Sequence, residues 1–166
     1  MKASLPLLLI SVLTLAGCGS LHNVMHSSAA PTAPLKANAS TPTVLGSYNK
    51  VAAVSGTSLY FINVKNGDTV SSPLNVQFGL KGMGVAPAGV EKAGTGHHHL
   101  LVDVAELDVN SGIPMSDQHR HFGLGQTEVS IALKPGMHTL QLVLGDQNHI
   151  PHHPVVMSER ITVTVK

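Results

Sequence analysis

Short runs in which apolar and polar residues alternate occupy the chain from residue 59 to its end, with turn-forming residues between them. Successive side chains of a strand point to opposite faces, so a period of two predicts strands. Seven runs alternate, and their in-phase positions are Tyr60, Ile62 and Val64; Leu74, Val76, Phe78 and Leu80; His98, Leu100, Val102 and Val104; Phe122 and Leu124; Val129, Ile131 and Leu133; His138, Leu140, Leu142 and Leu144; and Ile161, Val163 and Val165. The pattern predicts an all-β domain over residues 58–166, a seven-stranded β-sandwich of the immunoglobulin or fibronectin type.

The first 57 residues lack this alternation and divide into two segments. Residues 1–17 combine the basic Lys2, an apolar run from Leu5 to Leu15 and a small-residue end, which is the organisation of a signal peptide. Residues 18–57 are rich in Ser, Ala, Thr, Pro and Asn and predict a flexible tether. We therefore expect one folded domain that follows a tether.

The end of the signal segment, Leu15-Ala16-Gly17-Cys18, resembles the bacterial lipobox. The resemblance implies cleavage before Cys18 and acylation of that residue, and several acyl chains would anchor the protein firmly. Gly19 follows the cysteine, and in Gram-negative lipoproteins a residue other than Asp there implies transport to the outer membrane. We expect a lipid-anchored protein of the cell envelope that faces the periplasm. The alternative is a plain secretory signal with an incidental cysteine.

Composition limits the chemistry that this domain can carry out. Cys18 is the only cysteine, so an acylated Cys18 leaves no thiol for disulfides, catalysis or metal binding. Removal of residues 1–17 takes away Lys2 and no acid, and leaves nine basic and nine acidic side chains. Without a basic stripe or an aromatic platform, we expect no nucleic-acid partner.

Histidine is the exception in this otherwise weakly charged chain. Nine of the eleven histidines lie after residue 96, and eight of these nine form the clusters His97-His98-His99, His119-x-His121 and His149-x-x-His152-His153. Neutral imidazole is the commonest metal ligand in proteins. Because consecutive strands of a sandwich alternate in direction, the three clusters are expected at one end of the domain and His138 at the other.

Strand phase separates the histidines within a cluster. His98 shares the phase of Leu100 and is expected to face the core, whereas His97 and His99 share the opposite face. We predict that copper or zinc is bound by His97, His99, His119, His121, His149 and His152. We expect these ligands to be oriented or supported by His98, Asp103, Asp146 and His153. Six ligands exceed one tetrahedral site, so either some are bystanders or two ions bind.

The glycine-rich segment 78–89 is the other unusual stretch. It is either a long, tightly turned loop or a loop that packs over the histidine end and shapes the site. It is not a phosphate loop, because no Gly-Lys-Ser/Thr sequence follows it.

Four segments together resemble an uncharacterised bacterial family, domain-of-unknown-function 4399. They are Phe78 to Gly89, Gly96-His97-His98-His99-Leu100-Leu101-Val102-Asp103, His121-Phe122-Gly123 with Gln126-Thr127-Glu128, and Leu144-Gly145-Asp146-Gln147-Asn148-His149-Ile150-Pro151-His152. The resemblance covers roughly Leu59 to Lys166. It implies a small exported or lipid-anchored domain and implies no activity, so the functional prediction rests on the histidines.

The sequence favours a membrane-anchored metal-binding protein that buffers, delivers or senses copper or, failing that, zinc. Copper comes first because it has the higher intrinsic affinity for imidazole sites. A second envelope protein is a candidate partner. The alternative is a module without metal, whose loops recognise a glycan, peptide or protein of the envelope. A third interpretation is a metal-dependent enzyme with an open coordination position, in which Glu128 or Asp146 would be the base. No Ser-His-Asp spacing and no paired carboxylates support it, so the sequence favours a protein that is not an enzyme.

Overall fold

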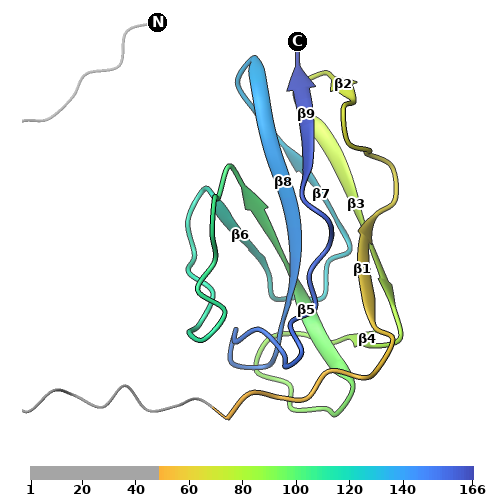
Figure 1. Ribbon diagram of the computed structural model, residues 1–166, viewed down its shortest axis with the longest axis vertical. Coiled ribbons are helices and arrows are strands. Elements are labelled where there is room, and N and C mark those ends of the chain that lie inside the picture. The colour runs from red at the N-terminus through yellow and green to blue at the C-terminus, as the bar shows by residue number, and fades with distance from the viewer. Residues whose placement is uncertain (1–48) are drawn as a thin grey trace, which may run out of the picture. The chain divides into compact units, whose positions relative to one another are not determined.

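The computed structural model describes residues 49–166, and the predictions for the signal peptide, Cys18 and the tether up to residue 48 lie outside the described residues. Two sheets form the domain (Figure 1). In the first, β3 (Leu74–Lys81) lies between β1 (Ser58–Phe61) and β7 (Glu128–Ile131). The second has the order β2 (Thr69–Val70), β9 (Ile161–Val165), β8 (Gly136–Gly145), β5 (Thr95–Val102) and β4 (Gly84–Val85), and β6 (His119–Phe122) also pairs with β5.

The inner faces of the two sheets share one apolar core. Val76 and Phe78 of β3 pack there with Leu100 of β5, Leu142 of β8 and Val163 of β9. Within residues 49–166 no helix is long and apolar enough to span a membrane. The predicted all-β sandwich is confirmed, and each of the seven predicted runs contains a strand. The immunoglobulin or fibronectin type stays a prediction, because the two-residue strands β2 and β4 are present as well.

The predicted phase of the first run is wrong for Tyr60 and Ile62, whereas Val64 of the same run lies in the core as expected. Leu59 is 5% exposed and faces the core, whereas Tyr60 is 47% and Ile62 56% exposed. Tyr60 lies opposite Gly79 on β3, and its ring occupies the space where a side chain at position 79 would stand. The aromatic ring therefore covers a glycine on the outer face. Leu124 is a second error, since it lies in the turn after β6 and is 83% exposed.

Ordered contacts begin several residues before the predicted domain start at residue 58. Ala52 forms a parallel bridge with His153, and the amide of Ala53 donates to the carbonyl of His153. Ala53 also packs against the core. Residues 51–53 are thus paired with the segment between β8 and β9.

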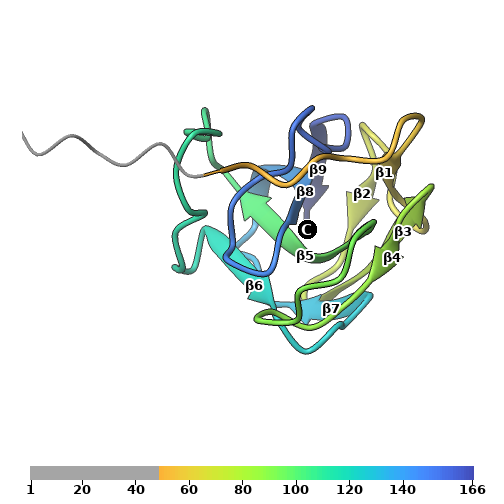
Figure 2. The same cartoon turned by 90° about the horizontal axis from the view of Figure 1, so that it is seen from below.

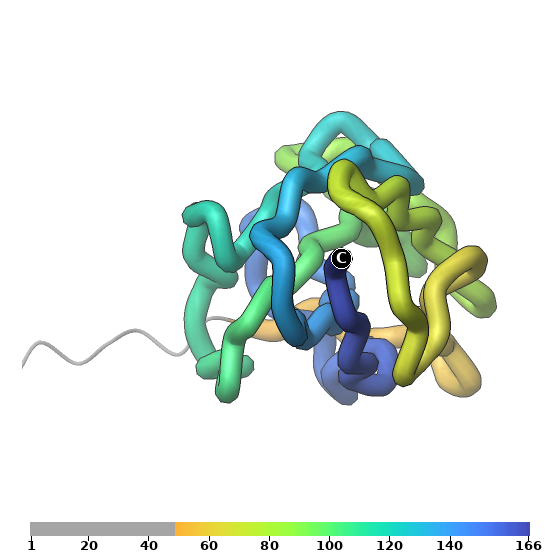
Figure 3. The backbone as a smooth tube through the Cα atoms, turned by 90° about the horizontal axis from the view of Figure 1, so that it is seen from above, coloured from red at the N-terminus to blue at the C-terminus, as the bar shows by residue number. Residues whose placement is uncertain are grey.

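β5 is buried on both faces, and this positions the histidines. Its inward positions His98, Leu100 and Val102 meet the core, as expected from the alternation. Its outward position Leu101 packs with Val143 and with a second apolar cluster that includes Val104, Leu107, Ile113 and Met157. Segment 103–118 supplies three members of this cluster and lies on the side of the second sheet away from the first (Figures 2 and 3).

Candidate metal centre

Four imidazoles converge near the start of β5 and the end of β8. These strand ends lie at the lower end of the domain in Figure 1. They belong to His97 and His99 of β5, His121 of β6 and His149 of the segment after β8. The ring centres of all six pairs lie between 4.7 and 6.0 Å apart. Residues from all three sequence clusters therefore meet at one end of the sandwich.

Strand geometry explains three of these four positions. His97 and His99 are two residues apart on β5 and therefore share its outer face. His121 lies directly opposite His99 in the antiparallel β5–β6 ladder, which places it on the same face. Three candidate ligands thus project from a hydrogen-bonded sheet rather than from loops.

The ring nitrogens of these three strand histidines are close enough for one ion. The Nε2 atoms of His97 and His99 are 2.9 Å apart. One nitrogen from each of His97, His99 and His121 lies within 4.8 Å of the others. An ion bound to each nitrogen at about 2.0–2.1 Å needs nitrogens roughly 3–4 Å apart. Small side-chain shifts therefore suffice to bind one transition metal.

Several nitrogens in this cluster are buried without a hydrogen-bond partner. They are Nδ1 of His97, Nδ1 of His99 and Nε2 of His121. A buried polar atom without a partner costs about 1–3 kcal/mol. His97 and His99 are 0% exposed, so the surface offers them no compensation. A bound ion would compensate for this cost only at the nitrogens that it contacts, and the facing nitrogens of His97 and His99 are Nε2 rather than Nδ1.

Burial also favours the neutral forms of His97, His99 and His121. Desolvation first, and then the neighbouring histidines, lower the pKa of His97 to about 4 and the pKa of His99 to about 2. Burial and the proximity of His149 lower the pKa of His121. At neutral pH each of these rings therefore keeps one nitrogen lone pair, and an ion that binds Nε2 of both His97 and His99 would replace the hydrogen bond between them. The three-residue group contains no carboxylate or thiolate, and an all-imidazole set suits copper, zinc or nickel rather than magnesium or calcium.

Three glycines make room for the imidazoles. A Cβ at Gly145 would stand 2.9 Å from Nε2 of His99, and a Cβ at Gly96 would stand 2.8 Å from Cε1 of His152. A Cβ at Gly123 would overlap Cε1 and Nε2 of His121. Side chains at these positions would displace the rings.

Replacing Gly123 by alanine is expected to push the His121 ring out of the cluster. We expect a loss of stability of about 1–3 kcal/mol and weaker metal binding, because the new methyl group overlaps the ring. Chemical unfolding and metal titration measure both effects. Gly112→Ala is the matched control, since no atom lies within 4 Å of its Cβ position. Equal behaviour of the two variants would contradict this prediction.

The glycine-rich loop packs over the histidine end, which was the sharper of its two interpretations. The amide of Ala88 donates to the carbonyl of Gly123, and the amide of Gly89 donates to the carbonyl of Gln147. These bonds tie the segment between β4 and β5 to the segments that carry His121 and His149.

Two predicted ligands lie outside the converging rings. Nδ1 of His119 is 3.0 Å from Oγ of Ser116. The ring nitrogens of the buried His152 lie 3.3 Å from the carbonyl of Leu144 and 3.2 Å from that of Thr95. Both histidines already have protein partners.

The predicted supporting residues lie in different surroundings in the structure. His98 faces the core beneath the cluster, 5.3 Å from the ring of Phe78. Neither of its ring nitrogens has a partner with regular hydrogen-bond geometry. Burial lowers its pKa to about 4, and a weaker hydrogen-bonding interaction with the Gln126 backbone partly opposes this effect. Oδ1 of Asp146 accepts the amides of Asn148 and Ile150, so Asp146 supports the His149 segment rather than an imidazole. His153 is exposed.

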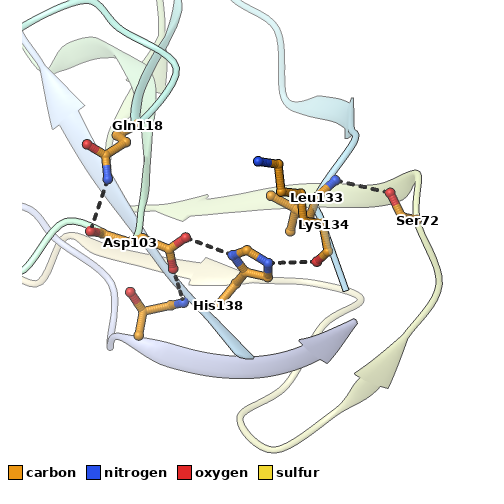
Figure 4. A network of polar contacts seen from close by, with 7 residues as sticks. Ser72, Asp103, Gln118, Leu133, Lys134 and His138 are labelled. Carbon is orange, nitrogen blue, oxygen red and sulfur yellow. Dashed lines mark hydrogen bonds and ion pairs between the residues drawn. The ribbon is translucent and has the colours of Figure 1, made fainter. Parts of the chain in front are cut away.

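Asp103 is misplaced in the sequence prediction. Its Oδ2 lies 2.7 Å from Nδ1 of His138, and its Oδ1 accepts the amide of Thr139 at 2.8 Å (Figure 4). Nε2 of His138 faces the carbonyl of Lys134 at 2.8 Å. This pair lies at the other end of the β5–β8 ladder, roughly 17 Å from the cluster for five strand residues. His138 was expected at that end, but Asp103 was expected at the cluster.

The Asp103–His138 pair is expected to stabilise the protein more at low pH than at high pH. The hydrogen bond to Asp103 raises the pKa of His138 above 6.5. The contribution of this pair to the stability of the fold is therefore complete below pH 6.5, and it is lost as the pH rises through the pKa of His138 in the folded protein. His138→Gln should cost at most about 1 kcal/mol at pH 5.5, since the pair is partly exposed, and less at pH 8.5. Urea unfolding at both values measures this, and an equal cost would contradict it.

The sequence interpretation missed segment 104–118 as a part of the site. The amide of Ile113 donates to the carbonyl of His149 at 2.8 Å. The sequence feature that could have indicated this segment is a set of apolar residues in a stretch without strand alternation, namely Val104, Leu107 and Ile113. Such residues predict that a loop packs against the domain.

The fold and the cluster define a β-sandwich with a buried, all-histidine candidate metal centre on the outer face of one sheet. The chain belongs to the family described as domain of unknown function (DUF4399), whose model matches residues 76–166. The match includes all four converging histidines and begins within β3, so β1 precedes it. No curated protein and no solved structure matches the chain.

Proposed function

We propose that this protein is a lipid-anchored protein of the cell envelope that binds a transition-metal ion, copper or otherwise zinc, and serves in buffering, delivery or sensing of that metal. The observation that supports it best is the group of His97, His99 and His121, whose neutral ring nitrogens lie within 4.8 Å of one another. Copper comes first because imidazole sites bind it most tightly among the common divalent ions.

The burial of the cluster disfavours the alternative of a loop-based recognition module. His97 and His99 are 0% exposed, so neither offers a hydrogen bond to a glycan or peptide. The loops at this end are bonded to one another rather than free to adapt to a ligand. Metal binding uses the buried nitrogens, whereas surface recognition would not.

Metal analysis of the purified full chain, followed by titration with Cu(II) and Zn(II), tests the proposal. We expect one ion per chain and a Kd below roughly 10 μM. Weaker binding of both ions would remove the metal function. Binding that survives the double variant His97→Ala with His99→Ala would place the metal elsewhere.

The anchor is tested separately. Cells that express the full chain should incorporate labelled palmitate into it, and Cys18→Ser should abolish the label and move the protein out of the membrane fraction. Unchanged membrane association of the variant would contradict the proposed anchor and would leave the metal site unaffected.

A further inference from the structure

We propose that His149 is a fourth metal ligand and that the segment that carries it is the gate through which the ion enters and leaves. This inference rests on the proposed metal function, which uses only the three strand histidines.

The ring of His149 closes the open side of the strand cluster. Its centre lies 5.0 Å from that of His97, 4.7 Å from that of His121 and 6.0 Å from that of His99. Four imidazoles that bind one ion tetrahedrally at about 2.0–2.1 Å have ring centres roughly 5 Å apart. The four rings are therefore spaced as one ion requires, with His149 somewhat far from His99.

In this structure no other histidine is placed to be the fourth ligand. A first-row ion on three imidazoles lacks the fourth ligand that completes a closed tetrahedral site. The ring nitrogens of His152 lie within hydrogen-bond distance of two carbonyls, and His119 is close to Ser116. His98 faces the opposite side of β5. His149 is the histidine beside the cluster for which no ring hydrogen bond is found among residues 49–166.

His149 differs from the other three ligands in how it is held. His97, His99 and His121 project from paired strands, whereas His149 follows β8 and has a φ of 66°. Residues other than glycine adopt this conformation only when their surroundings hold them there. Its amide donates to the carbonyl of Asp146, while Oδ1 of Asp146 accepts the amides on either side. The position of this ligand thus depends on a small local network.

A second layer covers the His149 segment. The amide of Ile113 donates to the carbonyl of His149, and Ile113 belongs to the apolar cluster on the outer face of the sheet. His97 and His99 are fully buried, whereas His121 and His149 are half-buried, so the side on which His149 lies is the side from which an ion reaches the strand histidines. Three ligands on the sheet then retain the ion, and the fourth controls its release.

The variant His149→Asn tests this role, because asparagine tolerates a positive φ and removes the imidazole. His153→Asn is the matched control, since it makes the same change at an exposed position of the same segment. The first measurement uses full chain with 15N-labelled histidine. Addition of Zn(II) should shift the ring nitrogen signals of His97, His99, His121 and His149, and should leave His152 nearly unchanged.

The second measurement is the rate of zinc transfer from the full chain to excess EDTA. We expect His149→Asn to raise this rate at least tenfold, and His153→Asn to match the unsubstituted protein. Equal rates in the two variants, or ring shifts at His97, His99 and His121 without one at His149, would overturn the inference and leave the metal function intact. Absence of zinc and copper binding by the unsubstituted chain would instead remove the proposed function itself.

Discussion

Replacing His121 by alanine is expected to weaken binding of copper or zinc by at least about 100-fold, which corresponds to about 2.7 kcal/mol. His121 lies opposite His99 on the neighbouring strand, so in the proposed site it adds a third imidazole to the two on β5. Without this ring, the cluster retains His97 and His99 of β5 and His149 of the segment after β8. Because the His121 side chain is only half-buried, the substitution should leave the fold intact. Metal titration by calorimetry or by competition with a chelator measures the change.

His119→Ala is the closest available control for this variant. His119 lies on the same strand and the same face, two residues away, and is likewise half-buried. Its ring nitrogen lies 3.0 Å from Oγ of Ser116, outside the converging rings. We expect at most a threefold loss of affinity for this variant. If both substitutions weaken binding equally, the metal does not lie where the rings converge.

Strand alternation was sufficient to predict the part of the site that lies on β5. The phase shared by His98, Leu100 and Val102 correctly separated His98 from His97 and His99. Alternation works here because a strand fixes the face of every side chain once one position is assigned. The order of the strands then placed the three clusters at one end, since successive strands of a sandwich reverse direction.

What the sequence did not indicate depends on contacts between distant segments. His119 and His121 share a face of β6, so strand phase does not distinguish them. The difference is that the ring of His119 lies within hydrogen-bond distance of Ser116, whereas the ring of His121 lies in the cluster. The ring nitrogens of His152 likewise lie within hydrogen-bond distance of the carbonyls of Leu144 on β8 and Thr95 on β5. Strand phase does not reveal such hydrogen bonds, because they depend on which backbone atoms reach a side chain after folding.

The predictions for the position of Asp103 and for the phase of β1 were wrong for a related reason. Asp103 directly follows β5, but its φ of 57° turns the chain, and its carboxylate binds His138 and the amide of Thr139. On β1, the phase was reversed because Tyr60 covers Gly79 on the outer face. In both cases a local backbone feature overrides the alternation from which the prediction was made.

The metal-free protein is expected to lose several kcal/mol of stability between pH 6.5 and pH 4.5. The pKa of His97 and that of His98 are lowered to about 4, chiefly by burial, and the pKa of His99 to about 2. The unfolded chain therefore binds protons that the folded chain cannot accept, so the stability is complete above 6.5 and is lost as the pH falls. Each histidine accounts for about 2 kcal/mol at pH 5, and total stabilities are about 5–15 kcal/mol. Urea unfolding of the EDTA-treated chain measures the loss.

His98→Leu isolates one of these histidines without touching the candidate ligands. His98 faces the core beside Phe78 and has no ring partner with regular hydrogen-bond geometry, so a leucine there fills a largely apolar space and removes one buried base. The variant should be about 2 kcal/mol more stable than the unsubstituted chain at pH 5, beyond any difference at pH 7.5, and should bind metal with unchanged affinity. A pH dependence identical to that of the unsubstituted chain would mean that His98 becomes protonated within the fold. The acid sensitivity would then arise from the opposite face of β5, where His97 and His99 lie.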